Sequence, residues 1–152
     1  MILVLDFQGR WPQRDKVEQF CHDVLNHFFK GRVKRELSLN LVMKKEMRDY
    51  GYTDGDRNEV TIEISRQHNG ETIPLPILMK TIAHELIHAK QFFRGEINNT
   101  NDVYAKDKKD YKKASYTFKP WEHEAHMMED FMYKLYWENP QYRELTYKVF
   151  HG

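Results

Sequence analysis

The segment His84-Glu85-Leu86-Ile87-His88 has the residue types and the spacing of a zinc site on a helix. Residues four apart lie on one face of an α-helix with their Cβ atoms about 5 to 6 Å apart, so the imidazoles of His84 and His88 can reach one Zn²⁺. Glu85 has the position of a general base that takes a proton from a zinc-activated water. The pattern therefore predicts metal-assisted hydrolysis with Zn²⁺ as the cofactor.

The residues around this motif favour a helix. Apolar residues recur there at helical intervals, namely Leu78, Ile82, Leu86, Ile87, Ala89 and Phe93. Pro74 and Pro76 suit the start of such a helix, and Gly95 suits its end. The alternative interpretation is that both histidines lie on the wet face of an amphipathic helix and bind no metal.

A catalytic zinc needs a third protein ligand, which we expect on the next helix. Residues 119–132 predict a helix that begins at Pro120, with an apolar stripe of Ala125, Met128, Met132 and Leu135. Its first turns offer four candidate ligands: Glu122, His123, Glu124 and His126. The two glutamates lie about 200° apart around a helix axis, so they do not easily reach the same ion.

Glu122 is favoured over Glu124 as the third ligand. His126 follows Glu122 by four residues on the same face and could hydrogen-bond a metal ligand or the bound water. Met128 follows Glu124 at the same interval and offers no such group. A third imidazole, from His123 or His126, is kept as an alternative.

The two segments together resemble the gluzincins, the zincin metallopeptidases whose third ligand is a glutamate on the next helix, in the small form of ImmA/IrrE-type proteins. That group has a Glu-x-Glu-Ala-Asn segment whose first glutamate binds the metal. Its register matches Glu122, and His126 stands where the group has Asn or Asp. Residues 81–89 are equally similar to SprT-like proteases, and the Pro120-Trp121-Glu122 segment is similar to small metallopeptidase-like proteins of bacteriophages.

This resemblance covers residues 76–136 and implies a zincin fold, a zinc ion and hydrolysis of a peptide bond in a protein or peptide substrate. The chain lacks the later His-Gly ligand segment of SprT-like proteases, so the DNA-repair function of that group is not implied. It also lacks a helix-turn-helix region, so a repressor-cleaving role is not implied either.

Composition limits the class of protein. The chain has 152 residues, which suits one domain over residues 1–152, and 24 Lys and Arg against 23 Asp and Glu give a net charge of +1. This balance offers no overall field that would attract nucleic acid or an anionic membrane. No segment approaches the roughly 20 apolar residues that cross a bilayer. We therefore expect no membrane partner.

Cys21 is the one cysteine of the chain. A single thiol excludes an internal disulfide framework and a cysteine-based zinc cluster, and it favours a reducing compartment. We expect Cys21 to be a core residue, because it falls on the apolar face of a predicted helix. Residues 1–6 lack a basic start and are interrupted by Asp6, so they fit a strand better than a signal peptide. These features predict a soluble, cytoplasmic protein.

The remaining elements follow from hydrophobic periodicity. The pattern predicts strands over residues 2–7 and 37–43 and a helix that begins near residue 15 and ends at Gly31. Residues 50–56 are typical of a turn. Residues 60–65 then predict a further strand of the same sheet, which we expect at an edge, where it would align an extended peptide by strand addition.

Residues 106–113 contain five lysines, and Tyr104, Tyr111 and Tyr116 lie nearby. Such a segment could contact phosphates and stack on bases, but its aspartates dilute the positive charge, so a solvated surface loop or short helix is favoured. The same three tyrosines, together with His126, are candidates for stabilising the oxyanion of a peptidase reaction. The sequence does not choose among them.

The expected fold is an α+β, zincin-like single domain. A small twisted sheet would pack on the metal-binding helix, and the second ligand-bearing helix and a short tail helix would close the other side. Five residues are expected to cover the core from the tail: Trp137, Tyr142, Leu145, Val149 and Phe150. The expected function is a zinc metallopeptidase. Two alternatives are a non-catalytic zinc-containing regulatory or binding module and a nucleic-acid-associated, SprT-like protein.

Overall fold

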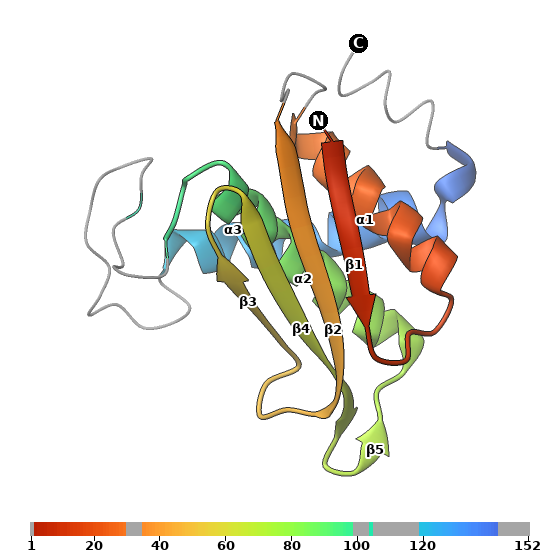
Figure 1. Ribbon diagram of the computed structural model, residues 1–152. Coiled ribbons are helices and arrows are strands. Elements are labelled where there is room, and N and C mark those ends of the chain that lie inside the picture. The colour runs from red at the N-terminus through yellow and green to blue at the C-terminus, as the bar shows by residue number, and fades with distance from the viewer. Residues whose placement is uncertain (1, 30–34, 99–103, 105–118, 143–152) are drawn as a thin grey trace.

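The computed structural model describes residues 2–29, 35–98, 104 and 119–142, and the five strands found among these residues form one sheet (Figure 1). The strands are β1 (Ile2–Gln8), β2 (Glu36–Glu46), β3 (Gly51–Gly55), β4 (Glu59–His68) and β5 (Glu71–Thr72). Their order is β1-β2-β4-β3, and β5 pairs with β4. β2 is parallel to both β1 and β4, whereas β3 and β5 are antiparallel to β4.

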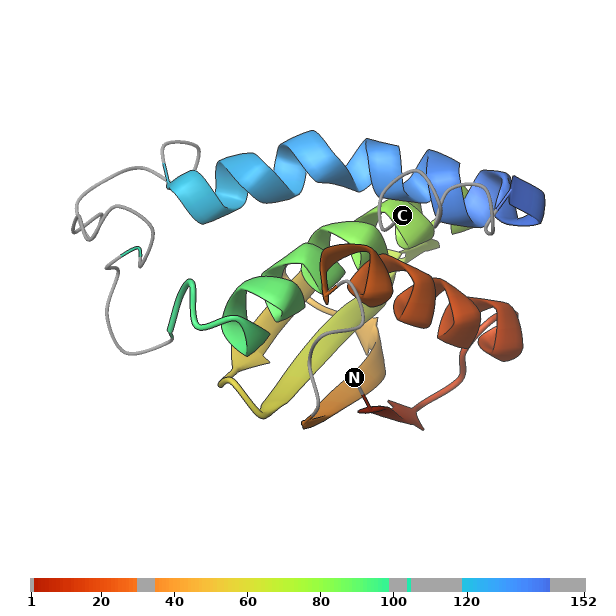
Figure 2. The same ribbon diagram turned by 90° about the horizontal axis from the view of Figure 1, so that it is seen from above.

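Alternation along the central strands gives the sheet one apolar face. On β2 and β4 every second side chain is buried, because successive residues of a strand point to opposite faces. The buried apolar set consists of Leu37, Leu39, Leu41, Met43, Val60, Ile62 and Ile64. The helices α1 (Arg14–Phe29) and α2 (Leu75–Phe93) lie together over one face of the sheet (Figure 2). The core forms between these two layers.

The helix α2 begins and ends where its sequence predicts. Pro74 precedes its first residue, and Gly95, with a φ of 68°, follows its last turn in the left-handed region that terminates many helices. Leu78, Ile82 and Leu86 of α2 are almost completely buried. This burial fixes the rotation of α2 on the sheet, and so the direction in which its polar side chains point.

A third layer lies across α2 on the side away from the sheet (Figure 2). It consists of α3 (Pro120–Met132) and a π-helical continuation, η2 (Tyr133–Glu138). The buried ring of Trp137 packs edge-on against Phe20 of α1, with 5.8 Å between centroids. The described residues thus form a mixed α/β domain of one sheet and three α-helices, with η2 closing over the core.

Two expectations about the sheet are wrong. Residues 50–56 do not simply form a turn, because Gly51–Gly55 is the strand β3. Glycine and aspartate are depleted in strands, yet Gly51 suits this position because a Cβ there would approach Glu85 Cγ to 2.9 Å. The strand over residues 60–65 is not at an edge, because β4 lies between β2 and β3. The two ends of the strand order are β1 and β3, and β3 is the one beside β4.

Other expectations are confirmed. The strands over residues 2–7 and 37–43 and the helix near residue 15 are present. Cys21 is fully buried, and burial raises the pKa of its thiol. None of the described helices is long and apolar enough to cross a bilayer. Several predictions fall on residues outside the described part: Gly31, residues 106–113, Tyr111, Tyr116, Leu145, Val149, Phe150 and the side chain of Tyr142.

Candidate metal centre

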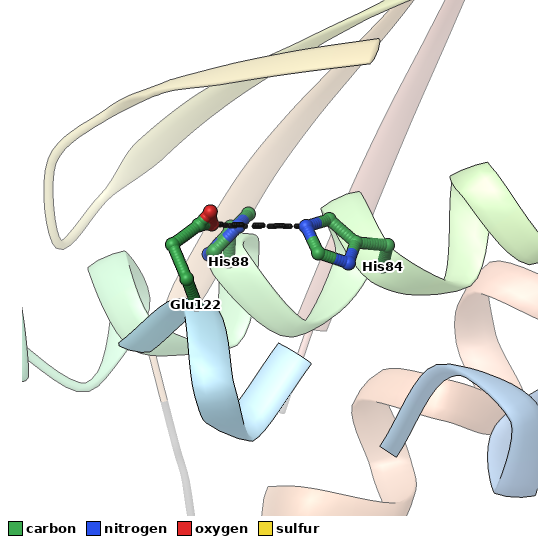
Figure 3. A group of neighbouring side chains, drawn as sticks. All are labelled: His84, His88 and Glu122. Atoms are coloured by element: carbon green, nitrogen blue, oxygen red, sulfur yellow. Dashed lines mark hydrogen bonds and ion pairs between the residues drawn. The ribbon is translucent and has the colours of Figure 1, made fainter. Parts of the chain in front are cut away.

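His84, His88 and Glu122 meet between α2 and α3 (Figure 3). All three are buried, with exposed fractions of 7%, 8% and 4%. His84 Nε2 lies 3.2 Å from His88 Nε2 and 3.7 Å from Glu122 Oε1. His88 Nε2 is in direct contact with the same carboxylate oxygen. One atom of each residue thus faces a common point.

This geometry fits a zinc ion. Bonds of about 2.0 to 2.1 Å in a tetrahedral site place neighbouring ligand atoms about 3.3 Å apart. The distances of 3.2 and 3.7 Å from His84 Nε2 are close to that value. An ion would have to separate His88 Nε2 from Glu122 Oε1, which a small side-chain movement can achieve. Two imidazoles and one carboxylate are also a donor set of catalytic zinc sites, which keep a fourth position open.

The carboxylates around the histidines favour their charged forms. Burial alone would lower the pKa of His84, but Glu122 and Glu129 outweigh it and raise that pKa to about 10. Burial likewise opposes protonation of His88, but Glu122 and Glu85 raise its pKa. The site therefore favours positive charge, and a metal ion bound there would compete with a proton.

Glu85 lies beside this group and is held by the edge strand β3. Its carboxylate is buried, and Thr53 Oγ1 donates a hydrogen bond of 2.5 Å to Glu85 Oε2. Gly51 on the same strand allows the close approach to the Glu85 side chain. Burial raises the pKa of Glu85 against the opposing effect of His88. A buried carboxylate with a raised pKa is suited to taking up and returning a proton.

Glu124 points to a different set of partners. Its Oε1 accepts hydrogen bonds from Lys90 Nζ at 2.8 Å and from Gln91 Nε2 at 2.9 Å. Lys90 is itself buried, and its ammonium group also contacts Glu96 Oε1 at 2.9 Å. The structure therefore brings Glu122, and not Glu124, to the histidine pair. His123 is exposed to solvent and is not in the ligand group.

His126 lies next to the site as expected, but its hydrogen bond goes to a residue that the sequence did not indicate. Its ring centroid is 4.7 Å from that of His84, and its Nδ1 donates to Glu129 Oε1 at 3.1 Å. Glu129 Oε2 in turn lies 3.7 Å from His84 Nδ1. Glu129 is seven residues after Glu122, which is two turns on the same face, and this spacing is the signal that could have found it.

Gln91 is the second residue that sequence analysis missed. Its side chain is fully buried and its Oε1 accepts a hydrogen bond from His88 Nδ1 at 2.8 Å. Gln91 is three residues after His88 on α2, an interval at which helical side chains meet. A buried amide at this interval could therefore have been read as a partner of the imidazole.

The residue that would stabilise an oxyanion is not identified by this geometry. Tyr104 is buried, and its ring lies 6.0 Å from the ring of Trp121. Tyr111 and Tyr116 lie outside the described residues. His126 is the remaining candidate from the sequence, and it lies beside His84.

Comparisons with known proteins add no assignment. No protein-family model matches the chain, and neither the curated proteins nor the solved structures gave a significant match.

Proposed function

We propose that this protein is a zinc-dependent metallopeptidase with a zincin-like fold of the gluzincin type. His84, His88 and Glu122 would hold the ion, and Glu85 would act as the general base. One observation supports this most strongly: two imidazole nitrogens and one carboxylate oxygen converge at a buried point, and a separate buried carboxylate lies alongside. The histidines and Glu85 come from one helix, and the glutamate ligand comes from the next.

A zinc ion bound there would supply Lewis-acid chemistry, lowering the pKa of a water molecule to about 7 and polarising the scissile carbonyl. Glu85 would take the proton from the attacking water and return it to the leaving amine. Its burial and raised pKa support this role, because a base that must later act as an acid works best with a pKa near the working pH. Thr53 would hold the Glu85 carboxylate in place.

The substrate would be an extended peptide of a protein or polypeptide chain. We place it along β3 instead of β4, because β3 is at the end of the strand order and its Thr53 side chain reaches Glu85. An edge strand can add a further strand by main-chain hydrogen bonds. This arrangement would bring a peptide bond to the side of the site where the general base lies.

Zinc content and peptidase activity together test the proposal. Native mass spectrometry is expected to show about one zinc per chain, held by the buried group of His84, His88 and Glu122 and not by the more exposed group of His84, His126 and Glu129. His84→Ala is expected to lose the ion. Glu85→Gln keeps the shape of the side chain but removes the proton acceptor, so it should retain zinc and lose cleavage of a denatured protein substrate. Loss of zinc in Glu85→Gln would show that this residue is a ligand.

Glu122 and Glu124 form a matched pair for the third ligand. Glu122→Ala removes a proposed ligand, so it is expected to weaken zinc binding more than the loss of a residue that only hydrogen-bonds a ligand, which costs roughly 10 to 100-fold. Glu124→Ala is expected to have the smaller effect, because its carboxylate contacts Lys90 and Gln91. His126→Ala should fall in the range of roughly 10 to 100-fold. A larger loss in Glu124→Ala than in Glu122→Ala would overturn this ligand assignment.

A further inference from the structure

Gln91 uses its whole amide group between the two helices of the site. Its Oε1 faces His88 Nδ1 at 2.8 Å. Its Nε2 donates to the main-chain oxygen of Trp121 at 2.9 Å and to Glu124 Oε1 at 2.9 Å. The side chain is fully buried on α2. Its two partners on α3 are one residue before Glu122 and two residues after it.

These contacts fix the orientation of the amide. A main-chain carbonyl and a carboxylate accept hydrogen bonds and donate none, so the NH₂ group must face Trp121 and Glu124. The oxygen of Gln91 is therefore turned to His88, and the Nδ1 of that imidazole must be the donor. His88 Nε2 is then the nitrogen directed at His84 Nε2 and Glu122.

The same amide connects a ligand of one helix to the main chain beside a ligand of the other. Trp121 immediately precedes Glu122, so a hydrogen bond to its carbonyl oxygen restrains the first turn of α3. Glu124, two residues after Glu122, is restrained by the same Nε2. One solvent-excluded side chain thus contacts the His88 imidazole and the main chain next to Glu122.

We infer that Gln91 is a positioning residue of the metal site: it selects Nε2 of His88 as the ligand atom and holds the start of α3 so that Glu122 reaches the same ion. The inference rests on the proposed zinc site. In a purely structural role, Gln91 would only pack between α2 and α3. Its substitution would then lower the free energy of unfolding without changing how His88 binds metal.

The first measurement uses the wild-type protein loaded with Zn²⁺. Long-range ¹H–¹⁵N correlation spectra distinguish an imidazole protonated on Nδ1 from one protonated on Nε2. His88 is expected to carry its proton on Nδ1 and to bind zinc through Nε2. Zinc bound through Nδ1 of His88 would overturn the inference, whatever any variant does. That result would leave the proposed zinc site standing. A wild-type protein that binds no zinc would instead overturn the proposed function, so the two failures can be told apart.

The second measurement compares zinc affinity in two variants by competition with a chelator. Gln91→Met keeps the length of the side chain but removes the acceptor and both donors, so zinc affinity is expected to fall by roughly 10 to 100-fold. Val24→Ala leaves a cavity in the core away from the ligands and should lower stability without changing zinc affinity. A Gln91→Met protein with lower stability and wild-type zinc affinity would show a purely structural role.

Discussion

His84 and His88 combine burial with a surplus of negative neighbours. Burial alone would keep both imidazoles neutral, yet the carboxylates of Glu122, Glu129 and Glu85 favour the protonated rings. A zinc ligand must present an unprotonated nitrogen. The same carboxylates therefore attract a cation to the site and make a proton the competitor of that cation.

Zinc affinity is expected to rise with pH, because zinc must displace a proton from His84. The pKa of His84 is raised from 6.5 to about 10, so the proton is still present at neutral pH and is lost only as the pH approaches the higher value. Each proton displaced makes the apparent affinity rise about tenfold per pH unit in that interval. Calorimetry in buffers of different ionisation enthalpy would count the protons released. A zinc affinity that does not change between about pH 7 and pH 9 would show that zinc displaces no proton from His84.

At the scale of elements, β3 carries more of the site than its length suggests. Gly51 allows the strand to approach α2, and Thr53 donates a hydrogen bond to Glu85 from the same strand. The strand pairs with β4 along its whole length, which holds both residues in register with the sheet. Glu85, the proposed general base, is therefore positioned by the sheet, whereas Glu122, the proposed third ligand, is positioned by α3.

Thr53→Val is expected to lower peptidase activity without removing zinc. Valine has a similar shape but cannot donate to Glu85 Oε2, so the carboxylate loses its orientation while the three ligands are untouched. The loss should be on the order of 10 to 100-fold, as for other partners of site residues. Thr61→Val on β4 is the matched control, because Thr61 hydrogen-bonds Asn40 away from the site. Equal losses in both variants would remove the special role of Thr53.

Local signals predicted the helix that carries His84 and His88, whereas the edge of the sheet depends on long-range pairing. The spacing of His84 and His88 and the apolar stripe of α2 are properties of a single segment, so the sequence alone reveals them. β3 contains Gly51, Asp54 and Gly55, which indicate a turn, and it becomes a strand through pairing with β4. The interior position of β4 likewise depends on which strands lie beside it.

The same distinction applies to the candidate site. Periodicity left Glu122 and Glu124 open, and it was the four-residue interval to His126 and the family register that favoured Glu122. In the structure, the packing of α3 on α2 turns Glu122 toward His88 and Glu124 toward Lys90. Thr53 comes from a distant strand, so its contact with Glu85 follows from tertiary structure.

At the scale of the whole molecule, α2 is the middle of three layers. The sheet contacts it on one side and α3 contacts it on the other, while α1 lies alongside (Figure 2). A charged cluster lies beside the α2–α3 contact: the buried Lys90 of α2 pairs with the buried Glu96, which follows α2, and with the partly buried Glu124 of α3. Because the proposed ligands come from both helices, the attachment of α3 to α2 determines whether they meet.

Lys90→Met is expected to destabilise the fold by up to about 3 to 5 kcal/mol, because it removes the buried cation that Glu96 and Glu124 share. Arg94 and the Gln91 amide remain as partners of these carboxylates. Lys90 Nζ is within 2.9 Å of Glu96 and 2.8 Å of Glu124. The free energy of unfolding would be measured in urea. Lys80→Met is the control, since Lys80 pairs with Asp130 at the surface and its loss should change stability little. Similar effects of both substitutions would show that the buried cluster is not special.

The buried cluster also restricts how this sequence can change over time. A substitution of Lys90 alone removes the cation that Glu96 and Glu124 share, whereas a simultaneous exchange of all three residues for apolar ones need not be destabilising. Related chains that carry an apolar residue in place of Lys90 should therefore also lack the carboxylates at positions 96 and 124. Correlated substitutions at positions 90, 96 and 124 would thus indicate that α2 and α3 are in contact, also in related sequences whose structures are unknown.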